Sequence, residues 1–136
     1  MEFKIVNDIL IDSTDKVRFN KGKNYYIDGY VQGVKYTNEN KILSMTGEVA
    51  SANNSSIYNS SITIDLKNKE IMDTDCDCED FIKRSSYKEA TTCKHIVAVG
   101  IYVSNLLKSS VISSLKQTTI TVKNNNKIKR NQEFIN

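Results

Sequence analysis

Four residues of this 136-residue chain have side chains well suited to binding a transition metal: Cys76, Cys78, Cys93 and His95. They are all of its cysteines and its only histidine, in the pattern C-x-C-x14-C-x-H. Because residues two apart on a strand project to the same face, Cys76 and Cys78 can reach one ion. The long loop then returns Cys93 and His95 to complete a tetrahedron. Three sulfurs and one nitrogen suit structural zinc, so the pattern predicts one Zn²⁺.

An alternative for the cysteines is burial as small hydrophobic residues. The sequence around the first pair is polar, which is unusual for cysteines that fill a core. The acidic residues there are Asp73, Asp75, Asp77, Glu79 and Asp80. We expect Asp73, Asp75 and Asp77 to form the solvated face of a strand whose other face carries the thiols, where they would also repel phosphate.

The same aspartates raise the question of calcium. Asp73, Asp75 and Asp77 resemble the start of a calcium-binding loop, which needs glycine at its sixth position and glutamate at its twelfth. Cys78 and Arg84 occupy those two positions, so the calcium interpretation fails.

Catalysis is a further alternative. Cys93 and His95 are close enough in sequence to form a nucleophile–base pair. Two more cysteines at ligand spacing favour metal instead, and a catalytic zinc needs an open ligand position. We therefore expect no enzymatic activity in this chain and no small-molecule substrate.

Composition places the chain in an ordinary class. Its length suits a single domain, and its content of 39% hydrophobic and 26% charged residues is that of a globular protein. The net charge of +3 permits nucleic-acid binding without arguing for it. No signal peptide is visible at the amino terminus, and no apolar run is long enough to span a bilayer. The expectation is a cytoplasmic protein without a membrane contact.

The hydrophobic pattern predicts two helices followed by a sheet. Apolar residues in segment 2–12 recur at helical spacing, and Ser13, Thr14 and Asp15 are N-cap residues for a second helix that Gly29 would end. After this glycine the period becomes that of strands. The expected strands are residues 30–36, 41–50, 58–66 and 70–77, and the expected turns are residues 37–40, 51–56 and 67–69.

The strongest helical pattern lies in residues 94–107, directly after the second ligand pair begins. Between the pairs, residues 79–92 are polar, with one helical turn expected at 80–84. This segment has little apolar content of its own, so we expect the metal to order it.

Together these elements predict an α+β fold, with N-terminal helices, an antiparallel meander of about four strands, and a zinc finger leading into a C-terminal helix. One domain is expected over residues 1–107, with the finger at about 70–107. Residues 108–136 are expected to hold a short helix at 111–116, an extended segment at 119–123, and a polar linker or tail.

The ligand pattern resembles a known family. Cys76-Asp77-Cys78, Cys93-Lys94-His95 and the apolar segment that follows resemble the SWIM zinc finger, whose signature is C-x-C-x(n)-C-x-H running into an apolar helix. Upstream, residues 19–31 resemble the F-x-R-G-x-x-Y…G-x-V segment that precedes the finger in bacterial SWI/SNF-like helicases. Residues 58–64 resemble the end of the strands that, in those proteins, lie between this segment and the finger. The resemblance covers about residues 13–107.

Two positions depart from that pattern. Glu79 replaces the proline that usually follows the second cysteine, and Lys21 replaces the arginine before the family glycine. Neither change removes a ligand, so the prediction of zinc is unaffected.

The resemblance implies an accessory module. SWIM fingers are thought to serve DNA binding and protein contact, and in bacterial SWI/SNF-like proteins the finger lies ahead of the ATPase motor. The chain has no G-x-x-x-x-G-K-[ST] phosphate loop, so we expect no motor within it. The implied partners are DNA and the helicase motor domains, on the same parent chain or on another protein.

Candidate nucleic-acid contacts come from the basic residues. Four of them form a run beside Tyr25 and Tyr26, and one begins the expected helix at residue 94. They are Lys16, Arg18, Lys21, Lys23 and Lys94; the tail adds Lys123, Lys127, Lys129 and Arg130. The alternative is a protein-interaction module that docks on the motor domains or on a partner without touching nucleic acid, through a strand edge or the apolar face of residues 94–107. We expect that face to pack on its own sheet instead.

Overall fold

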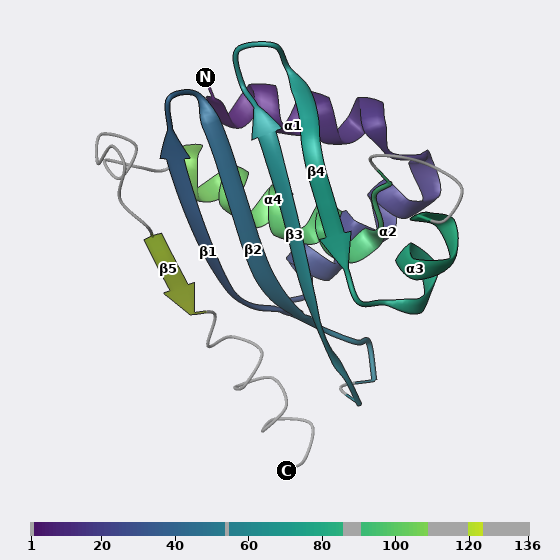
Figure 1. The fold of residues 1–136 in the computed structure, drawn as a ribbon. Helices are drawn as coiled ribbons and strands as arrows, with labels where there is room; N and C mark the ends of the chain where they lie inside the picture. The colour runs from purple at the N-terminus through teal and green to yellow at the C-terminus, as the bar shows by residue number, and fades with distance from the viewer. Residues whose placement is uncertain (1, 54, 86–90, 109–119, 124–136) are drawn as a thin grey trace.

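Helices and strands follow one another in the order that the hydrophobic pattern predicts (Figure 1). The computed structural model describes residues 2–53, 55–85, 91–108 and 120–123. The elements are α1 (Glu2–Ser13), α2 (Lys16–Ile27), β1 (Val31–Glu39), β2 (Ile42–Ala50), β3 (Ile57–Asp65), β4 (Glu70–Cys76), α3 (Glu79–Ser85), α4 (Lys94–Lys108) and β5 (Ile120–Lys123). The predicted α+β class is confirmed. The helix expected at 111–116 lies outside the described residues.

The sheet is an antiparallel meander with one added strand. Its order is β4-β3-β2-β1-β5, so that consecutive strands β1 to β4 are neighbours and β5 pairs with the outer edge of β1. Of the extended segment expected at 119–123, residues 120–123 form this strand of the same sheet. Register shifts occur in β1 between Val31 and Gly33, and in β4 where Met72 has no partner between Ile71 and Asp73.

The turn between β1 and β2 differs from the prediction. Residues 37–39 belong to β1, with Thr37 opposite Ser44 and Glu39 opposite Ile42. Only two residues connect the strands, Asn40 and Lys41, and both have positive φ values of 54° and 65°. Two-residue turns of this kind match the right-handed twist of paired strands, and the long pairing of the two strands outweighs the turn propensity of the polar residues before it.

The predicted ends of α2 are confirmed in their geometry. The Asp15 side chain accepts a hydrogen bond from the backbone N–H of Arg18 at 2.9 Å, as an N-cap should. At the other end Gly29 has a φ of 81°, and the N–H groups of Gly29 and Tyr30 donate to the carbonyls of Tyr26 and Tyr25. This pair of bonds closes the helix and directs the chain into β1.

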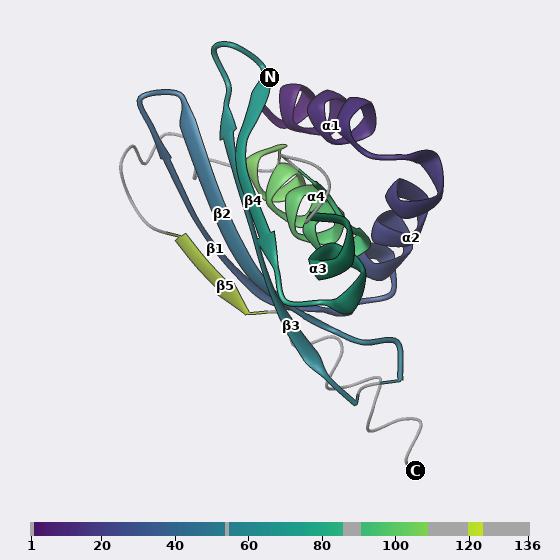
Figure 2. The same ribbon diagram turned by 45° about the vertical axis from the view of Figure 1, so that its right-hand side comes forward.

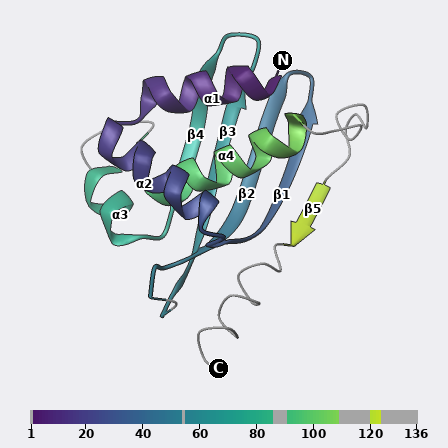
Figure 3. The same cartoon turned by 180° about the vertical axis from the view of Figure 1, so that it is seen from behind.

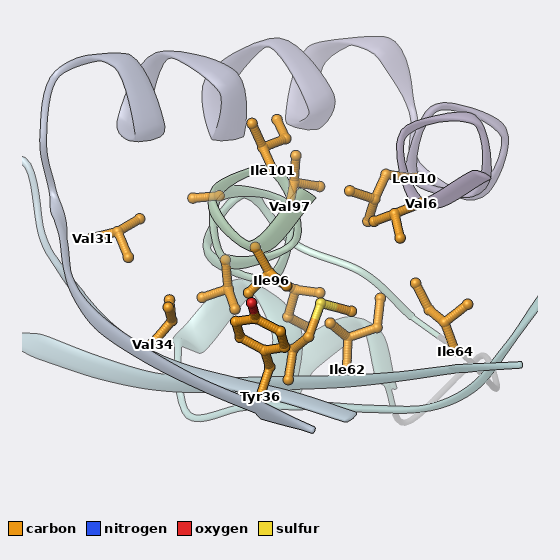
Figure 4. Packing of buried hydrophobic residues seen from close by; sticks show 14 of the residues in the cluster. Val6, Leu10, Val31, Val34, Tyr36, Ile62, Ile64, Ile96, Val97 and Ile101 are labelled. Atoms are coloured by element: carbon orange, nitrogen blue, oxygen red, sulfur yellow. The ribbon is translucent and has the colours of Figure 1, made fainter. Parts of the chain in front are cut away.

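The sheet and the helices form three layers, with both helical layers on the same side of the sheet, as Figures 2 and 3 show. α4 lies against β1, β2 and β3, and α1 and α2 pack on α4 from its outer side. In Figure 4, Ile96 points from α4 toward Tyr36 and the sheet, while Val97 and Ile101 lie on the side of α2. The apolar face of residues 94–107 is therefore buried within this chain, as expected, and does not serve as an interaction surface. No helix in the described part of the chain is long and apolar enough to span a membrane.

Alternate residues of the strands face the helices or the solvent. Leu43, Met45, Ile62 and Ile64 are buried beneath α4. The opposite face of the sheet is not covered by any described element (Figure 2). It carries polar residues from the four long strands: Lys35, Thr37, Ser44, Thr46, Glu48, Ser61, Thr63, Asp73 and Asp75.

A buried hydroxyl gives a test of the core. Tyr36 is 3% exposed, and its Oη makes no hydrogen bond with any described residue. Because an unsatisfied buried hydroxyl is costly, we expect Tyr36→Phe to leave the free energy of unfolding unchanged or to raise it by up to about 1 kcal/mol. Chemical denaturation measures this.

The matched control is Tyr25→Phe. The Tyr25 hydroxyl accepts a hydrogen bond from the backbone of Ala52, so its removal should lower stability by about 1 kcal/mol. A clear loss of stability in Tyr36→Phe would show that its hydroxyl has a partner, such as a buried water, and would contradict the prediction.

Candidate metal centre

The four predicted ligands meet in the structure. Cys76 is the last residue of β4, Cys78 precedes α3, Cys93 precedes α4, and His95 lies in the first turn of α4. Their ligand atoms all lie within 4.8 Å of one another, and the four residues are 0–3% exposed. They form the only such cluster of His, Cys, Asp and Glu among the residues that the structure describes. Two chain segments are thus joined at one buried point.

The distances fit a tetrahedral zinc site. His95 Nδ1 lies 3.9 Å from Cys76 Sγ and 3.9 Å from Cys93 Sγ. With Zn–S and Zn–N bonds of the usual lengths, tetrahedral sulfur and nitrogen ligands lie about 3.6 Å apart. Nδ1 is therefore the nitrogen that faces the ion. The four protein ligands complete the coordination, which is the arrangement of structural rather than catalytic zinc.

Two tyrosines hold the imidazole of His95 in place. The ring centroid of Tyr58 lies 4.6 Å from that of His95 at an interplanar angle of 35°, and Tyr25 meets it edge-on at 5.5 Å and 77°. Coordination through Nδ1 puts the proton on Nε2, which is buried and has no described hydrogen-bond partner. The rings, rather than a hydrogen bond, thus fix its orientation. The sequence pattern does not reveal this role of Tyr58, because only the strand register brings β3 under α4.

The sulfur atoms also receive polar contacts. Ser60 pairs with Cys76 across β3 and β4, and its Oγ lies 3.2 Å from Cys76 Sγ. The backbone N–H of Phe81 donates to Cys78 Sγ at 3.3 Å. Such bonds orient ligands and stabilise thiolate charge. The strand pairing of Ser60 would have revealed its position once the hairpin register was known.

The thiols need a cation to ionise together. Without metal, the hydrogen bond to Cys78 raises the pKa of Cys76 to about 11, and hydrogen bonds to Cys76 and Cys78 hold the pKa of Cys93 far above its usual range. The pKa of Cys78 is correspondingly lowered, because Cys76 and Cys93 donate to it. The three buried thiols therefore do not ionise independently of one another. Zn²⁺ would supply the positive charge that allows all three to act as thiolates.

The acidic residues around the first pair face away from the site. Asp73, Asp75 and Asp77 are exposed, whereas Cys76 and Cys78 are buried. The expected alternation between a solvated acidic face and a thiol face is confirmed. Asp77 Oδ1 accepts a hydrogen bond from the backbone N–H of Asn59 at 2.9 Å, which ties the end of β4 to β3.

The five basic residues proposed from sequence do not form one group. Lys16, Lys21 and Lys23 are exposed on α2. Lys94 Nζ lies 5.6 Å from the centre of the Tyr25 ring, next to the metal centre. Arg18 instead donates to Asp80 and Asp15, with its Nη2 2.7 Å from Asp80 Oδ1.

The Arg18 ion pair perturbs both partners. Hydrogen bonds from Arg18 hold the pKa of the Asp80 carboxyl well below its usual range, and Asp80 in turn raises the pKa of the Arg18 guanidinium. The ion pair therefore favours the charged form of both groups, and the Arg18 guanidinium makes its contacts within the chain.

The comparison with protein families agrees with this geometry. Residues 62–103, which run from within β3 through β4 and α3 into α4, match the family model of the SWIM zinc finger. No curated protein and no solved structure matched the chain. The matched region contains all four ligands and the greater part of α4, the helix that carries the histidine. The chain therefore contains a zinc-binding module of the SWIM type, in which Cys76, Cys78, Cys93 and His95 are positioned to bind one zinc ion.

Proposed function

We propose that this module binds nucleic acid and serves as an accessory domain of an ATP-dependent SWI/SNF-like DNA helicase or translocase. The observation that carries the nucleic-acid part is the set of three exposed lysines on α2, Lys16, Lys21 and Lys23. None of them forms an ion pair with another described residue. The helicase part rests on the sequence resemblance upstream of the finger.

The position of α2 supports a phosphate contact. Its inner face, with Gly22 at the centre, packs on α4, so the lysines belong to the outermost layer of the molecule. Lys16 and Lys23 are seven residues apart, which is about 10 Å along a helix axis. The exposed aspartates of β4 belong to the sheet on the other side of α4, so their repulsion of phosphate does not act on this surface.

A salt titration tests this proposal. Each lysine that neutralises a phosphate contributes about one unit to the slope of log affinity against log salt concentration. The triple variant Lys16→Gln, Lys21→Gln and Lys23→Gln should therefore bind more weakly at low salt, with a slope reduced by about 2–3 units. Duplex DNA, single-stranded DNA and single-stranded RNA are titrated in parallel at several salt concentrations.

The control removes the same charge elsewhere. Lys4, Lys35 and Lys67 are also exposed, but they lie on α1, β1 and the β3–β4 turn. Their triple Gln variant should keep the slope of the unchanged chain. Equal losses in both variants would mean that binding follows net charge alone, and no salt dependence in the unchanged chain would contradict nucleic-acid binding.

A second candidate function is docking on a protein, with the motor domains as the partner that the resemblance suggests. The observation that favours it is Met72, which is 55% exposed on the edge strand β4 beside Asp73. Because Met72 is the bulged residue of β4, it disfavours simple addition of another strand to this edge. A protein that docks there would contact side chains rather than the backbone of β4. In that case the chain would bind its protein partner, and a titration with DNA would show no salt-dependent binding.

A further inference from the structure

A group of polar residues joins the corner between α1 and α2 to the segment that separates the two ligand pairs. We name this group the polar clasp; it consists of Thr14, Arg18, Asp80, Arg84 and Thr92. Asp80 lies two residues after Cys78, and Thr92 directly precedes Cys93. The clasp therefore contacts both ends of the segment that the zinc site must bring together.

The first link is a bidentate contact between Arg18 of α2 and Asp80 of α3. Arg18 Nε donates to Asp80 Oδ2 at 2.8 Å, and Arg18 Nη2 donates to Asp80 Oδ1 at 2.7 Å. The residues are 62 positions apart in sequence. Asp15 fixes the other side of the guanidinium, since Arg18 Nη1 donates to Asp15 Oδ2 at 2.9 Å. Planar, bidentate arginine–carboxylate contacts constrain direction as well as distance.

The second link runs from Asp80 to the end of the segment. Arg84 donates to both Asp80 oxygens, at 3.2 Å and 3.1 Å, and also to the backbone carbonyl of Thr92. The hydroxyl of Thr92 lies 2.8 Å from that of Thr14, and both residues are buried, at 3% and 9% exposure. The contacts thus return to the α1–α2 corner and close a ring.

The helix α3 is short and buries little apolar surface. α3 has seven residues, too few for an independently stable helix, and Phe81 is its one buried residue. The side chains of Arg18, Asp80 and Arg84 are only 27–38% exposed, so water screens their contacts less than those of surface pairs.

We propose that the polar clasp holds the two ligand pairs in register, and that Arg18 and Asp80 are positioning residues for zinc rather than contacts of a partner. Packing of the N-terminal helices against the finger and retention of zinc are then coupled, because Arg18 belongs to α2 and Asp80 to the finger. This inference depends on the zinc site and not on nucleic-acid binding.

Zinc affinity of the full chain tests the proposal. Arg18→Gln, Asp80→Asn and the double variant are loaded with one Zn²⁺, and affinity is measured by competition with a chromophoric chelator. Loss of residues that orient metal ligands typically lowers metal affinity about 10- to 100-fold, and we expect that loss in each single variant. Because the two side chains act through one contact, the double variant should lose little more than either single one.

The control is Glu79→Gln. Glu79 pairs with Lys83 within α3 at 3.2 Å, and both side chains are largely exposed, at 83% and 73%. It lies closer in sequence to Cys78 than Asp80 does, and its replacement should leave zinc affinity unchanged. Denaturation of the zinc-loaded proteins separates positioning from general stability, and Arg18→Lys, which keeps the charge but loses the bidentate contact, replaces Arg18→Gln if that variant does not fold.

Two results would overturn the proposal. One is zinc affinity in Arg18→Gln and Asp80→Asn equal to that of Glu79→Gln, even if their stability falls. The other is additive losses of zinc affinity in the double variant, which would show that Arg18 and Asp80 act independently.

Discussion

Cys93→Ser is expected to lose the zinc ion and, with it, cooperative folding of the region from β4 to α4. Cys93 is fully buried beside Cys76 and His95, and no other described side chain is placed to take its position. Binding at structural zinc sites contributes about 10–16 kcal/mol in small fingers, which is as large as the whole stability of a typical domain. Loss of a ligand therefore affects the fold as well as the metal.

Metal analysis and circular dichroism measure this result. The unchanged chain should contain one zinc per molecule, whereas Cys93→Ser and a chelator-treated sample should contain none and should unfold at lower temperature. Asp75→Asn is the control, because Asp75 lies next to Cys76 in sequence but is exposed. It should retain one zinc. A folded, zinc-free chain with three titratable thiols would contradict the assignment of the metal centre.

Gly22→Ala is expected to force α2 away from α4. A Cβ atom at residue 22 would lie 2.6 Å from Val97 Cβ and 2.7 Å from the backbone oxygen of Lys94. The backbone of α4 cannot yield locally, so the helices must separate. Overpacking typically costs about 1–3 kcal/mol, and we expect the upper end of that range, reduced by the gain of about 1 kcal/mol from replacing glycine within a helix.

Urea denaturation of the zinc-loaded chain measures the change, with Gly100→Ala as the matched control. Gly100 also lies in a helix, but a Cβ there would meet Leu10 Cδ1 at 2.7 Å, which is the movable end of a side chain. Gly100→Ala should therefore be milder than Gly22→Ala. Equal stability of Gly22→Ala and the unchanged chain would show that the two helices can separate at no cost.

The glycine illustrates how local and tertiary effects compete. Within the sequence, Gly22 only weakens a helix, because it has the highest conformational freedom in the unfolded chain. In the structure it permits a close approach between α2 and α4, with Tyr25 of α2 against His95 of α4. A residue that lowers the local stability of α2 thus allows the contact that orients a zinc ligand.

The amino-acid sequence by itself determined the ligand set, the order of the elements and most of their ends. These features depend on short-range chemistry: the spacing of Cys76 and Cys78, the cap at Asp15, the left-handed residue Gly29, and the apolar period of α4. Each is decided within a few residues of chain, so it can be predicted without the fold.

The tertiary structure alone decided which distant residues meet. Arg18 was predicted to contact nucleic acid, but its partner Asp80 lies 62 residues away, and only the packing of α2 beside the finger brings the two together. The place of the β1–β2 turn depended on strand pairing, and the contact of Tyr58 with His95 depended on how α4 crosses the sheet. Such contacts form because whole apolar faces of helices and strands are buried against one another. The free energy of that burial depends on all the packed elements, so it cannot be derived from any one local segment.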